Sequence, residues 1–303
     1  MSSGNELDGK VIIVTGAARG IGRALALYMG CRGARVVAND IDPDILDALA
    51  AEISGEGGEI LPLAGSVSDW SFAEELIARA VERFGALDGL INNAGLHYQA
   101  LPWEEDPHSA RRLLEVNVLG ALYCGMQALK VFVAQRHGSL INVTSGAHLG
   151  VAGQSTYAAS KGAIASLTYS WALDALPYGV RVNAVAPLAH TRMTDSLAAY
   201  QADSGKPADN GQGGGIRVRE PEDLAPLFGY LLADCSAQLS GQILRFNGSE
   251  LSLIDHPLVG ASRHSREHWE IDDVRSVLEG QMLDTLSPVG LGRMVIPWPP
   301  GAK

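Results

Sequence analysis

Cysteine is scarce in this chain of 303 residues, occurring only as Cys31, Cys124 and Cys235. Three widely separated cysteines cannot form a disulfide framework, so their use is typical of a protein in a reducing compartment. We expect all three to be small buried hydrophobic residues. A disulfide-stabilised secreted scaffold is therefore excluded as the class of protein.

Basic charge and long apolar runs are also lacking. The 23 Lys and Arg residues are outnumbered by 34 Asp and Glu residues, giving a formal net charge of −11, and such a field repels phosphate backbones and anionic lipid surfaces. No uninterrupted apolar run approaches the ~20 residues that span a bilayer, and the amino terminus has no signal-peptide pattern. We expect a cytoplasmic protein with neither nucleic acid nor a membrane as a partner.

Short β-branched runs alternate with longer segments of helical periodicity over most of the chain. This pattern predicts βαβ crossovers and a parallel sheet with helices on both faces. We expect a single doubly wound α/β domain over residues 1–251, with a seven-stranded parallel sheet. The expected strands are 11–15, 35–39, 60–64, 87–92, 139–143, 181–186 and 242–246, and the expected helices lie near 20–32, 43–54, 69–84, 108–136, 156–178 and 221–233.

Two regions interrupt the alternation. Residues 203–215 are rich in Gly, Asp and Asn and are expected to form a mobile loop. Residues 252–303 form a C-terminal extension with one expected helix, at 265–281. Because the extension contains many apolar residues, we expect it to pack on the domain or on a neighbouring subunit. Our hypothesis is that it closes over a substrate site.

A glycine-rich turn follows the first expected strand, in the segment Thr15-Gly16-Ala-Ala-Arg19-Gly20-Ile21-Gly22. Glycines at a strand-to-helix turn allow the backbone to approach a pyrophosphate, and the helix amino terminus favours the anion. The next strand is followed by Asp40, which could accept both ribose hydroxyls and would repel the 2′-phosphate of NADP. These residues favour NAD, although Arg19 is a nearby cation that would favour NADP.

Tyr157 and Lys161 are four residues apart in an expected helix. This spacing places the phenol and the ammonium on one helix face. An ammonium, together with the positive charge of a nicotinamide, could lower a phenol pKa from about 10 toward about 7 in a partly desolvated site. The pair is therefore a candidate acid/base centre.

These motifs occur in a recognisable order: the glycine turn, Asn92-Asn93-Ala94-Gly95, Asn117, a serine after the fifth strand, and Tyr157-x-x-x-Lys161. In order and spacing they resemble the short-chain dehydrogenase/reductase family over roughly residues 8–250. The resemblance implies a Rossmann fold, a nicotinamide cofactor, and a homo-oligomer, dimer or tetramer, whose dimer interface uses helices 108–136 and 156–178.

The resemblance also implies residue roles. Tyr157 would be the acid/base, Lys161 would hold the ribose and lower the phenol pKa, and Asn117 would anchor a proton-relay water. Ser66 would face the adenine amine, and Thr191 would contact the nicotinamide amide. The full set of implied cofactor contacts is Gly16, Arg19, Gly20, Ile21, Gly22, Asp40, Ser66, Val67, Asn93, Ala94, Gly95, Tyr157, Lys161, Pro187 and Thr191.

The substrate-orienting hydroxyl of the family has two candidates here. Counting back from Tyr157 reaches Thr144, whereas the register of the fifth strand places Ser145 at the catalytic position. We favour Ser145 and keep Thr144 as the alternative. Further along, residues 186–194 are similar to the hydroxyacyl-CoA dehydrogenase part of peroxisomal multifunctional enzymes.

Histidines offer a competing interpretation. His264-x-x-Glu267-His268 matches an inverted zinc-protease pattern, which needs both histidines on one helix face and a third ligand. Because basic residues interleave these histidines, we expect a solvated helix start and no metal. His97, His148 and His190 follow expected strands, where one of them could help to bind substrate.

Together these features predict an NAD-dependent oxidoreductase that moves a hydride between nicotinamide and a secondary alcohol or ketone. Tyr157, Lys161, Ser145 and Asn117 form the expected catalytic set. The alternatives are an NADP-linked ketone reductase and a cofactor-sensing protein without turnover. The latter would not need the Ser, Tyr and Lys together.

Overall fold

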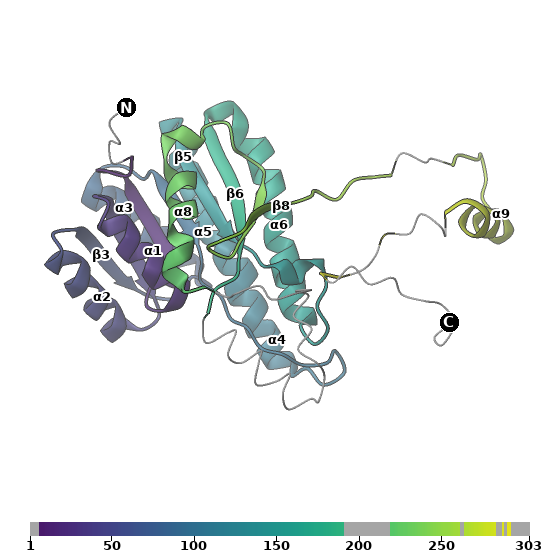
Figure 1. Cartoon of the computed structure of the whole chain (residues 1–303), viewed down its shortest axis with the longest axis horizontal. Helices are drawn as coiled ribbons and strands as arrows, with labels where there is room; N and C mark the ends of the chain where they lie inside the picture. Colours follow the sequence, from purple (N-terminus) through teal and green to yellow (C-terminus); the bar gives the residue numbers. More distant parts are fainter. Residues whose placement is uncertain (1–5, 191–218, 261–263, 283–286, 288–289, 292–303) are drawn as a thin grey trace.

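An eight-stranded sheet forms the centre of the computed structural model, which describes residues 6–190, 219–260, 264–282, 287 and 290–291 (Figure 1). The strand order is β3-β2-β1-β4-β5-β6-β7-β8. All neighbouring pairs up to β7 are parallel, and β8 is antiparallel to β7. The strands are β1 (Val11–Thr15), β2 (Arg35–Asp40), β3 (Glu59–Ala64), β4 (Gly89–Asn92), β5 (Gly138–Val143), β6 (Val180–Pro187), β7 (Ile243–Phe246) and β8 (Leu251–Ile254).

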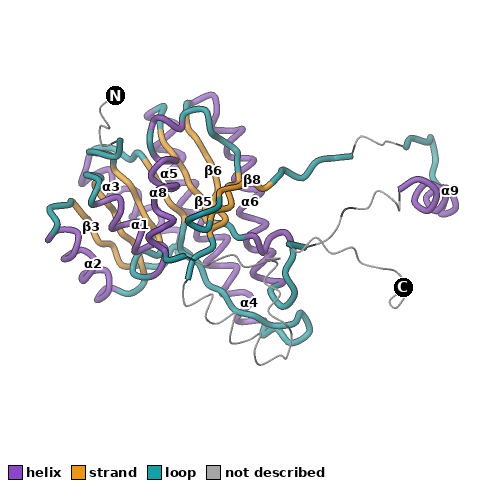
Figure 2. Tube along the Cα trace, viewed as in Figure 1, coloured by secondary structure: helices purple, strands orange, loops and turns teal. Residues whose placement is uncertain are grey.

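Helices cover both faces of this sheet, as Figure 2 shows. One buried cluster joins the sheet to α1, α2 and α8, and a second joins its other face to α3, α5 and α6. Because the inner strands are buried on both faces, they are continuous apolar runs such as Val11–Thr15. The helices are α1 (Gly20–Gly30), α2 (Pro43–Gly55), α3 (Trp70–Phe84), α4 (Pro107–Leu114), α5 (Ala121–Gln135), α6 (Ser155–Ala175), α8 (Ala225–Leu232) and α9 (Ile271–Val277). The doubly wound α/β prediction is confirmed.

The strand count differs from the prediction by one. β8 continues from β7 through a turn in which the Asn247 side chain accepts hydrogen bonds from the backbone of Ser249 (2.9 Å) and Glu250 (2.7 Å). This Asn-Gly turn is a hairpin signal that the sequence contains. Leu251 and Leu253 are both exposed, so burial of an apolar face does not define this strand. The predicted boundary between the domain and the C-terminal extension, after residue 251, falls inside β8.

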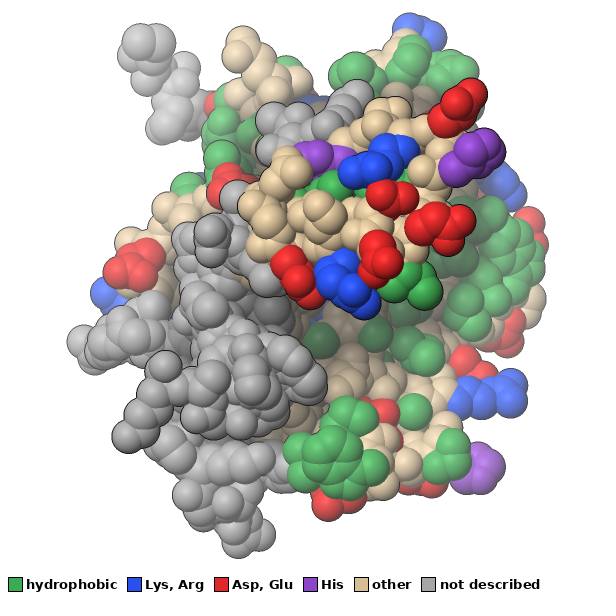
Figure 3. Space-filling model, turned by 90° about the vertical axis from the view of Figure 1, so that its right-hand side faces the viewer, with side chains coloured by type: hydrophobic (Ala, Val, Ile, Leu, Met, Phe, Trp, Pro, Cys, Tyr) green, Lys and Arg blue, Asp and Glu red, His purple; other side chains and the backbone are tan. Residues whose placement is uncertain are grey.

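The chain leaves the sheet after β8 and leads to α9, which lies well apart from the domain in Figure 1. α9 starts six residues later than predicted, and a π-helical turn (Leu278–Met282) follows it. Leu258 and Val259 are 89% and 90% exposed, so this part of the extension does not pack on its own domain. Figure 3 faces this side of the molecule and shows acidic, basic and hydrophobic side chains next to one another.

One helical run, Pro107–Gln135, is long and apolar enough to cross a membrane by length and composition alone. In the fold, its residues Cys124, Ala128 and Phe132 are fully buried in the cluster beneath α3 and α6. The run therefore acts as a core helix. The predicted mobile loop at 203–215 lies outside the described residues.

The three cysteines are free, but only Cys124 is buried. Burial raises the pKa of the Cys124 thiol to about 12, which keeps it an inert hydrophobic side chain. Cys31 and Cys235 are exposed, so the expectation of burial was wrong for them. Both follow the ends of helices, where short-range sequence patterns do not reveal exposure.

Candidate active site

The glycine turn between β1 and α1 is fixed by residues that follow β4. The Thr15 hydroxyl accepts hydrogen bonds from the backbone of Asn93 (3.0 Å) and Ala94 (3.1 Å), and the Asn93 amide donates to the carbonyls of Thr15 (2.9 Å) and Gly16 (3.1 Å). A Cβ atom at Gly22 would lie only 2.1 Å from the Gly16 carbonyl oxygen. The turn thus requires glycine for its own packing, and Asn93 holds it in place.

The amino terminus of α1 has no side-chain cap, unlike those of α2, α3 and α4. Asp42, Asp69 and Asp106 cap α2, α3 and α4 through their carboxylates. At α1 the N-cap residue is Arg19, which makes no side-chain cap. The first N–H groups of α1 therefore keep their hydrogen-bonding capacity, which suits the pyrophosphate of a dinucleotide.

Asp40 lies at the end of β2, beside this turn. Its two carboxylate oxygens accept hydrogen bonds from the backbone of Ala18 (3.0 Å) and Ile41 (2.8 Å). Arg19, the cation that would favour a 2′-phosphate, forms an ion pair with Asp42 at 2.8 Å. This pairing lowers the pKa of Asp42 and compensates the Arg19 charge within the protein. The sequence analysis did not identify Asp42 as a partner of Arg19.

The predicted adenine-contacting turn after β3 is held together by its own serines. The hydroxyls of Ser66 and Ser68 lie 2.8 Å apart, and the Ser66 hydroxyl also accepts from the Ser68 backbone (3.3 Å). Val67 is buried against Gly120, where a Cβ atom would lie 2.5 Å from its methyl carbon. The backbone of this turn is therefore held in position for the predicted adenine contact, while the Ser66 hydroxyl is already hydrogen-bonded to Ser68.

Tyr157 and Lys161 lie together near the start of α6. The Lys161 nitrogen is 5.7 Å from the centre of the Tyr157 ring and donates to the Val143 carbonyl at 2.8 Å. Burial lowers the pKa of Lys161 to about 8 and raises the pKa of Tyr157, with an interaction from the Ser145 side chain opposing the latter shift. In the protein alone burial outweighs the opposing interaction, so the pKa of Tyr157 is raised and its expected lowering remains a prediction for the cofactor-bound enzyme.

The structure separates the two candidate hydroxyls after β5. Thr144 is buried, and its hydroxyl donates to the carbonyl of Lys161 at 2.8 Å. Ser145 is the N-cap residue of the short helical turn Gly146–Leu149. Its side chain interacts with the Tyr157 phenol and opposes the rise in the pKa of that phenol. The geometry therefore favours Ser145 as the hydroxyl beside the acid/base and gives Thr144 a structural role.

Asn117 lies in a π-helical turn (Glu115–Gly120) between α4 and α5, a kind of irregularity that is frequent at functional sites. Its side chain accepts from the Leu96 backbone N–H (2.7 Å), donates to the Leu96 carbonyl (2.9 Å) and donates to the Ser160 hydroxyl (3.1 Å). These bonds use the amide to connect α6 to the segment after β4. Both Nδ2 donors are used in this way, so a water bound by the side chain would have to donate to Oδ1.

Two histidines of the prediction lie at this site. The ring centres of His97 and Tyr157 are 4.6 Å apart in an edge-on arrangement, and a ring nitrogen of His148 bonds to the Ser145 carbonyl at 2.5 Å. Burial lowers the pKa of both histidines, so both are neutral near pH 7. The third, His190, follows β6 and is exposed.

Sequence reasoning missed Glu105. Its carboxylate accepts from the hydroxyl and, at 3.4 Å, from the backbone N–H of Thr156, the residue before Tyr157. The N-cap residue of α6, Gln154, provides no side-chain cap. Glu105 therefore satisfies the amino terminus of the catalytic helix from a separate loop, a contact between distant residues that leaves no local sequence signal.

The remaining predicted positions are less informative. Pro187 ends β6 at the carboxyl edge of the sheet, whereas Thr191 lies outside the described residues. His264, Glu267 and His268 lie in a bend before α9, not on a helix face. Within the described part of the chain, no three His, Cys, Asp or Glu side chains are grouped to hold a metal ion.

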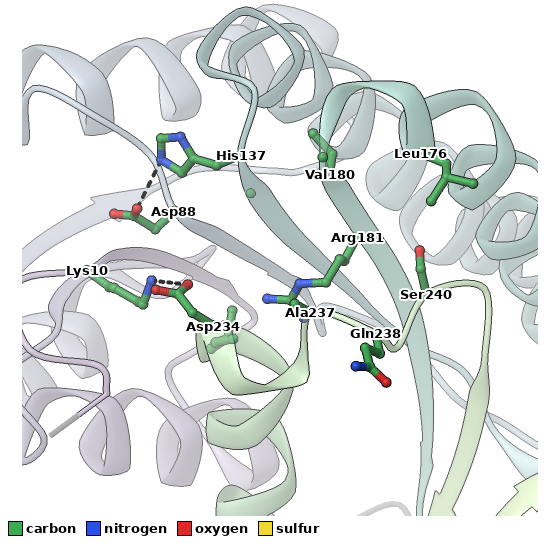
Figure 4. Close-up of a pocket in the computed structure, with 13 residues that line it drawn as sticks. Lys10, Asp88, His137, Leu176, Val180, Arg181, Asp234, Ala237, Gln238 and Ser240 are labelled. Atoms are coloured by element: carbon green, nitrogen blue, oxygen red, sulfur yellow. Dashed lines mark hydrogen bonds and ion pairs between the residues drawn. The ribbon is translucent and has the colours of Figure 1, made fainter. Parts of the chain in front are cut away.

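A separate cavity of about 550 Å³ lies at the opposite edge of the sheet (Figure 4). Lys10 and Asp88 precede β1 and β4, so this is the amino-terminal edge of the strands. Lys10 pairs with Asp234 at 2.8 Å and His137 contacts Asp88 at 3.2 Å, while Arg181 donates to the carbonyls of Leu231 and Ala233. Ligands of open α/β sheets bind at the carboxyl edge, where the residues described above converge.

The fold and these residues define a dinucleotide-binding α/β enzyme with a Tyr-Lys centre. A family model for short chain dehydrogenases matches residues 10–202. The chain therefore belongs to the short-chain dehydrogenase/reductase family of oxidoreductases, whose members bind a nicotinamide cofactor. This confirms the resemblance noted in the sequence.

Individual relatives agree with this membership. The chain is 34% identical over 247 residues to 3-oxoacyl-[acyl-carrier-protein] reductase FabG of Thermotoga maritima, covering 80% of this chain and 98% of that protein. It is 33% identical over 266 residues to hydroxyacyl-CoA dehydrogenase ChsB1 of Mycobacterium tuberculosis, covering 83% and 81%. A crystal structure of a short chain dehydrogenase from Mycobacterium avium matches with a TM-score of 0.80 and 30% identity, covering 93% of this chain and 97% of that one.

Proposed function

We propose that the protein is an NAD-dependent dehydrogenase that interconverts a secondary alcohol and a ketone. The observation that carries this proposal is the arrangement of Ser145, Tyr157 and Lys161 at the carboxyl edge of the sheet, on the same edge as Asp40 and the amino terminus of α1. The similarity to a hydroxyacyl-CoA dehydrogenase and a 3-oxoacyl reductase supports hydroxyacyl or oxoacyl compounds as the first substrates to test.

The catalytic groups divide the proton chemistry between them. During oxidation Tyr157 accepts the hydroxyl proton at its phenol oxygen, while the Ser145 hydroxyl donates a hydrogen bond to the substrate oxygen. Lys161 holds the ribose and favours the phenolate through its charge. The bound nicotinamide supplies the hydride acceptor or donor and, when oxidised, a positive charge. Because burial raises the pKa of Tyr157 in the protein alone, that charge completes the activation of the phenol.

The choice of NAD depends on the surroundings of the adenosine ribose. Asp40 would accept the ribose hydroxyls with its remaining lone pairs and repel a 2′-phosphate, and Arg19 is already paired with Asp42. An NADP-linked reductase is the second candidate, supported by the similarity to a 3-oxoacyl-[acyl-carrier-protein] reductase. Binding of NADP would require Arg19 to leave its ion pair with Asp42 and to bind the 2′-phosphate instead.

The setting of the enzyme completes the proposal. The free cysteines fit a reducing compartment, and we place the enzyme in the cytoplasm as a homo-oligomer, a dimer or tetramer. Residues 252–303 are proposed to pack on a neighbouring subunit, because Leu258 and Val259 are exposed in the single chain. The Leu291 N–H donates to the Gly150 carbonyl at 3.0 Å, which brings the extension beside the loop after Ser145.

Cofactor titration tests the choice of NAD. The unmodified protein should bind NAD more tightly than NADP. Asp40→Ala should raise the dissociation constant of NAD about tenfold and reduce the preference for NAD over NADP, because both acceptors for the ribose hydroxyls are lost. Arg19→Ala is the matched variant and should leave the NAD dissociation constant within a few-fold. Tighter binding of NADP by the unmodified protein would overturn the choice and make Arg19 the phosphate ligand.

A further inference from the structure

The segment that follows β4 contains an unusual concentration of unsatisfied polar groups. Among the described residues, six buried side-chain nitrogen and oxygen atoms have no hydrogen-bond partner, and four of these belong to His97, Tyr98 and Gln99. They are Nδ1 of His97, the hydroxyl of Tyr98, and both polar atoms of Gln99. Leaving one such group unpaired costs about 1–3 kcal/mol, so four in three consecutive residues call for a physical reason.

This segment lies against the acid/base. The His97 ring meets the Tyr157 ring edge-on at 4.6 Å between centres, and the Lys161 charge acts on the same imidazole. The backbone beyond Gln99 is fixed, because the N–H of Ala100 donates to the Gly153 carbonyl at 3.0 Å. Thr156 lies beside the Tyr98 phenol but without hydrogen-bond geometry. An unsatisfied nitrogen of His97 therefore lies beside Tyr157, and Gln99 follows two residues later on a backbone that is held in place.

The charges around the segment restrict what can satisfy them. Burial lowers the pKa of His97, the Gln154 side chain opposes this shift and the nearby Lys161 charge adds to it, so the imidazole is neutral near pH 7. Gln154 interacts with the ring, while Nδ1 of His97 has no hydrogen-bond partner. The carboxylates of Glu105 and Asp106 act on the adjoining Tyr98 and raise its pKa together with burial. The groups of the segment are themselves neutral and therefore pair best with an uncharged oxygen function. The carboxylates beside Tyr98 oppose the attraction that the Lys161 charge would exert on an anion.

We infer that the substrate carries, besides the reacting alcohol or ketone, a second uncharged oxygen function that hydrogen-bonds to His97 and Gln99. A hydroxyl, an ester or thioester carbonyl, or an amide would serve, whereas a free carboxylate would not. This inference rests on the proposed dehydrogenase function and specifies its substrate class. The unsatisfied groups stabilise the complex when the substrate pairs them and discriminate against compounds that leave them unpaired.

Three secondary alcohols test the inference: methyl 3-hydroxybutanoate, 3-hydroxybutanoate and hexan-2-ol, assayed with NAD and with NADP. The ratio of kcat/KM for the ester to that for hexan-2-ol should exceed about tenfold, and the carboxylate should be a poorer substrate than the ester. His97→Phe keeps an aromatic ring beside Tyr157, and Gln99→Leu keeps similar bulk. Each should lower the ester-to-hexanol ratio about tenfold, and His97→Asn should restore part of it.

Thermal unfolding of the ligand-free enzyme separates a substrate-binding role from a structural one. His97→Phe and Gln99→Leu should hold or raise Tm, because each removes an unpaired buried group. Gln127→Leu on α5 is the control, since its Nε2 is also unpaired and buried but belongs to another element. It should likewise hold or raise Tm and leave the substrate ratio unchanged.

Two results would overturn the inference alone: turnover with an unchanged ratio in both His97→Phe and Gln99→Leu, or a fall of several degrees in Tm for both. The second result would mean that the groups have partners within the protein. No turnover of any alcohol with either cofactor would instead overturn the proposed dehydrogenase function, and the inference with it.

Discussion

Two neighbouring hydroxyls after β5 have opposite surroundings, and from this difference we propose different roles for them. The Thr144 hydroxyl is buried and bonded to the Lys161 carbonyl, while the Ser145 side chain acts on Tyr157. Ser145→Ala should lower kcat about 100-fold with little change in Tm, because it removes one hydrogen bond to the reacting oxygen. Thr144→Val should instead cost about 1 kcal/mol of stability and leave kcat within a few-fold.

Steady-state kinetics and thermal unfolding of both variants distinguish these roles. A large loss of kcat in Thr144→Val, with Ser145→Ala nearly fully active, would make Thr144 the substrate-orienting hydroxyl and Ser145 the structural one. From the sequence this choice depends on strand register, because the count back from Tyr157 reaches Thr144 instead of Ser145. The hydrogen bond to Lys161 that immobilises Thr144 is a contact across the fold, which spacing alone does not reveal.

At the scale of elements, the catalytic helix α6 depends on a residue outside it. Glu105 caps its amino terminus through Thr156, the residue before Tyr157. Glu105→Ala should lower stability by about 1 kcal/mol and kcat about tenfold, because losing the cap loosens the turn that positions the phenol. Glu105→Gln keeps one acceptor oxygen and should recover most of kcat.

Asp106→Ala is the matched control for Glu105. Asp106 caps α4 through the backbone N–H and the hydroxyl of Ser109, both at 2.8 Å. Its loss should cost similar stability while leaving kcat unchanged. Equal losses of kcat in Glu105→Ala and Asp106→Ala would show that the effect comes from general destabilisation rather than from the position of Tyr157.

The elements themselves were largely predictable, for physical reasons. The strands buried on both faces are continuous apolar runs, and aspartates with helix-initiating prolines mark the starts of α2 and α4. β8 was missed because its leucines face outward, so that pairing with β7, not burial, defines it. The start of α9 is set by a capping box of Glu270 and Asp273, a local signal that the helical periodicity alone does not show.

At the scale of the whole molecule, the extension beyond β8 reaches away from the domain and returns to the loop after Ser145 at Leu291. Truncation after Asp255 keeps β8 and removes the exposed arm, residues 256–303, which includes Leu291. If the arm packs on a neighbouring subunit and reaches the loop after Ser145, truncation should reduce the oligomeric mass in solution and raise the substrate KM while leaving NAD affinity near normal. Unchanged mass and unchanged KM would show the extension to be an accessory.

The central claim is that Tyr157 is the proton-transferring group of an NAD-dependent alcohol dehydrogenase. The most direct measurement is NADH formation by the full-length enzyme and by Tyr157→Phe with the same alcohol, alongside NAD affinity by titration. The account predicts at least a 100-fold loss of kcat with the NAD dissociation constant within a few-fold, since only the titrating oxygen is removed. Turnover of Tyr157→Phe within tenfold of the unmodified enzyme would contradict it.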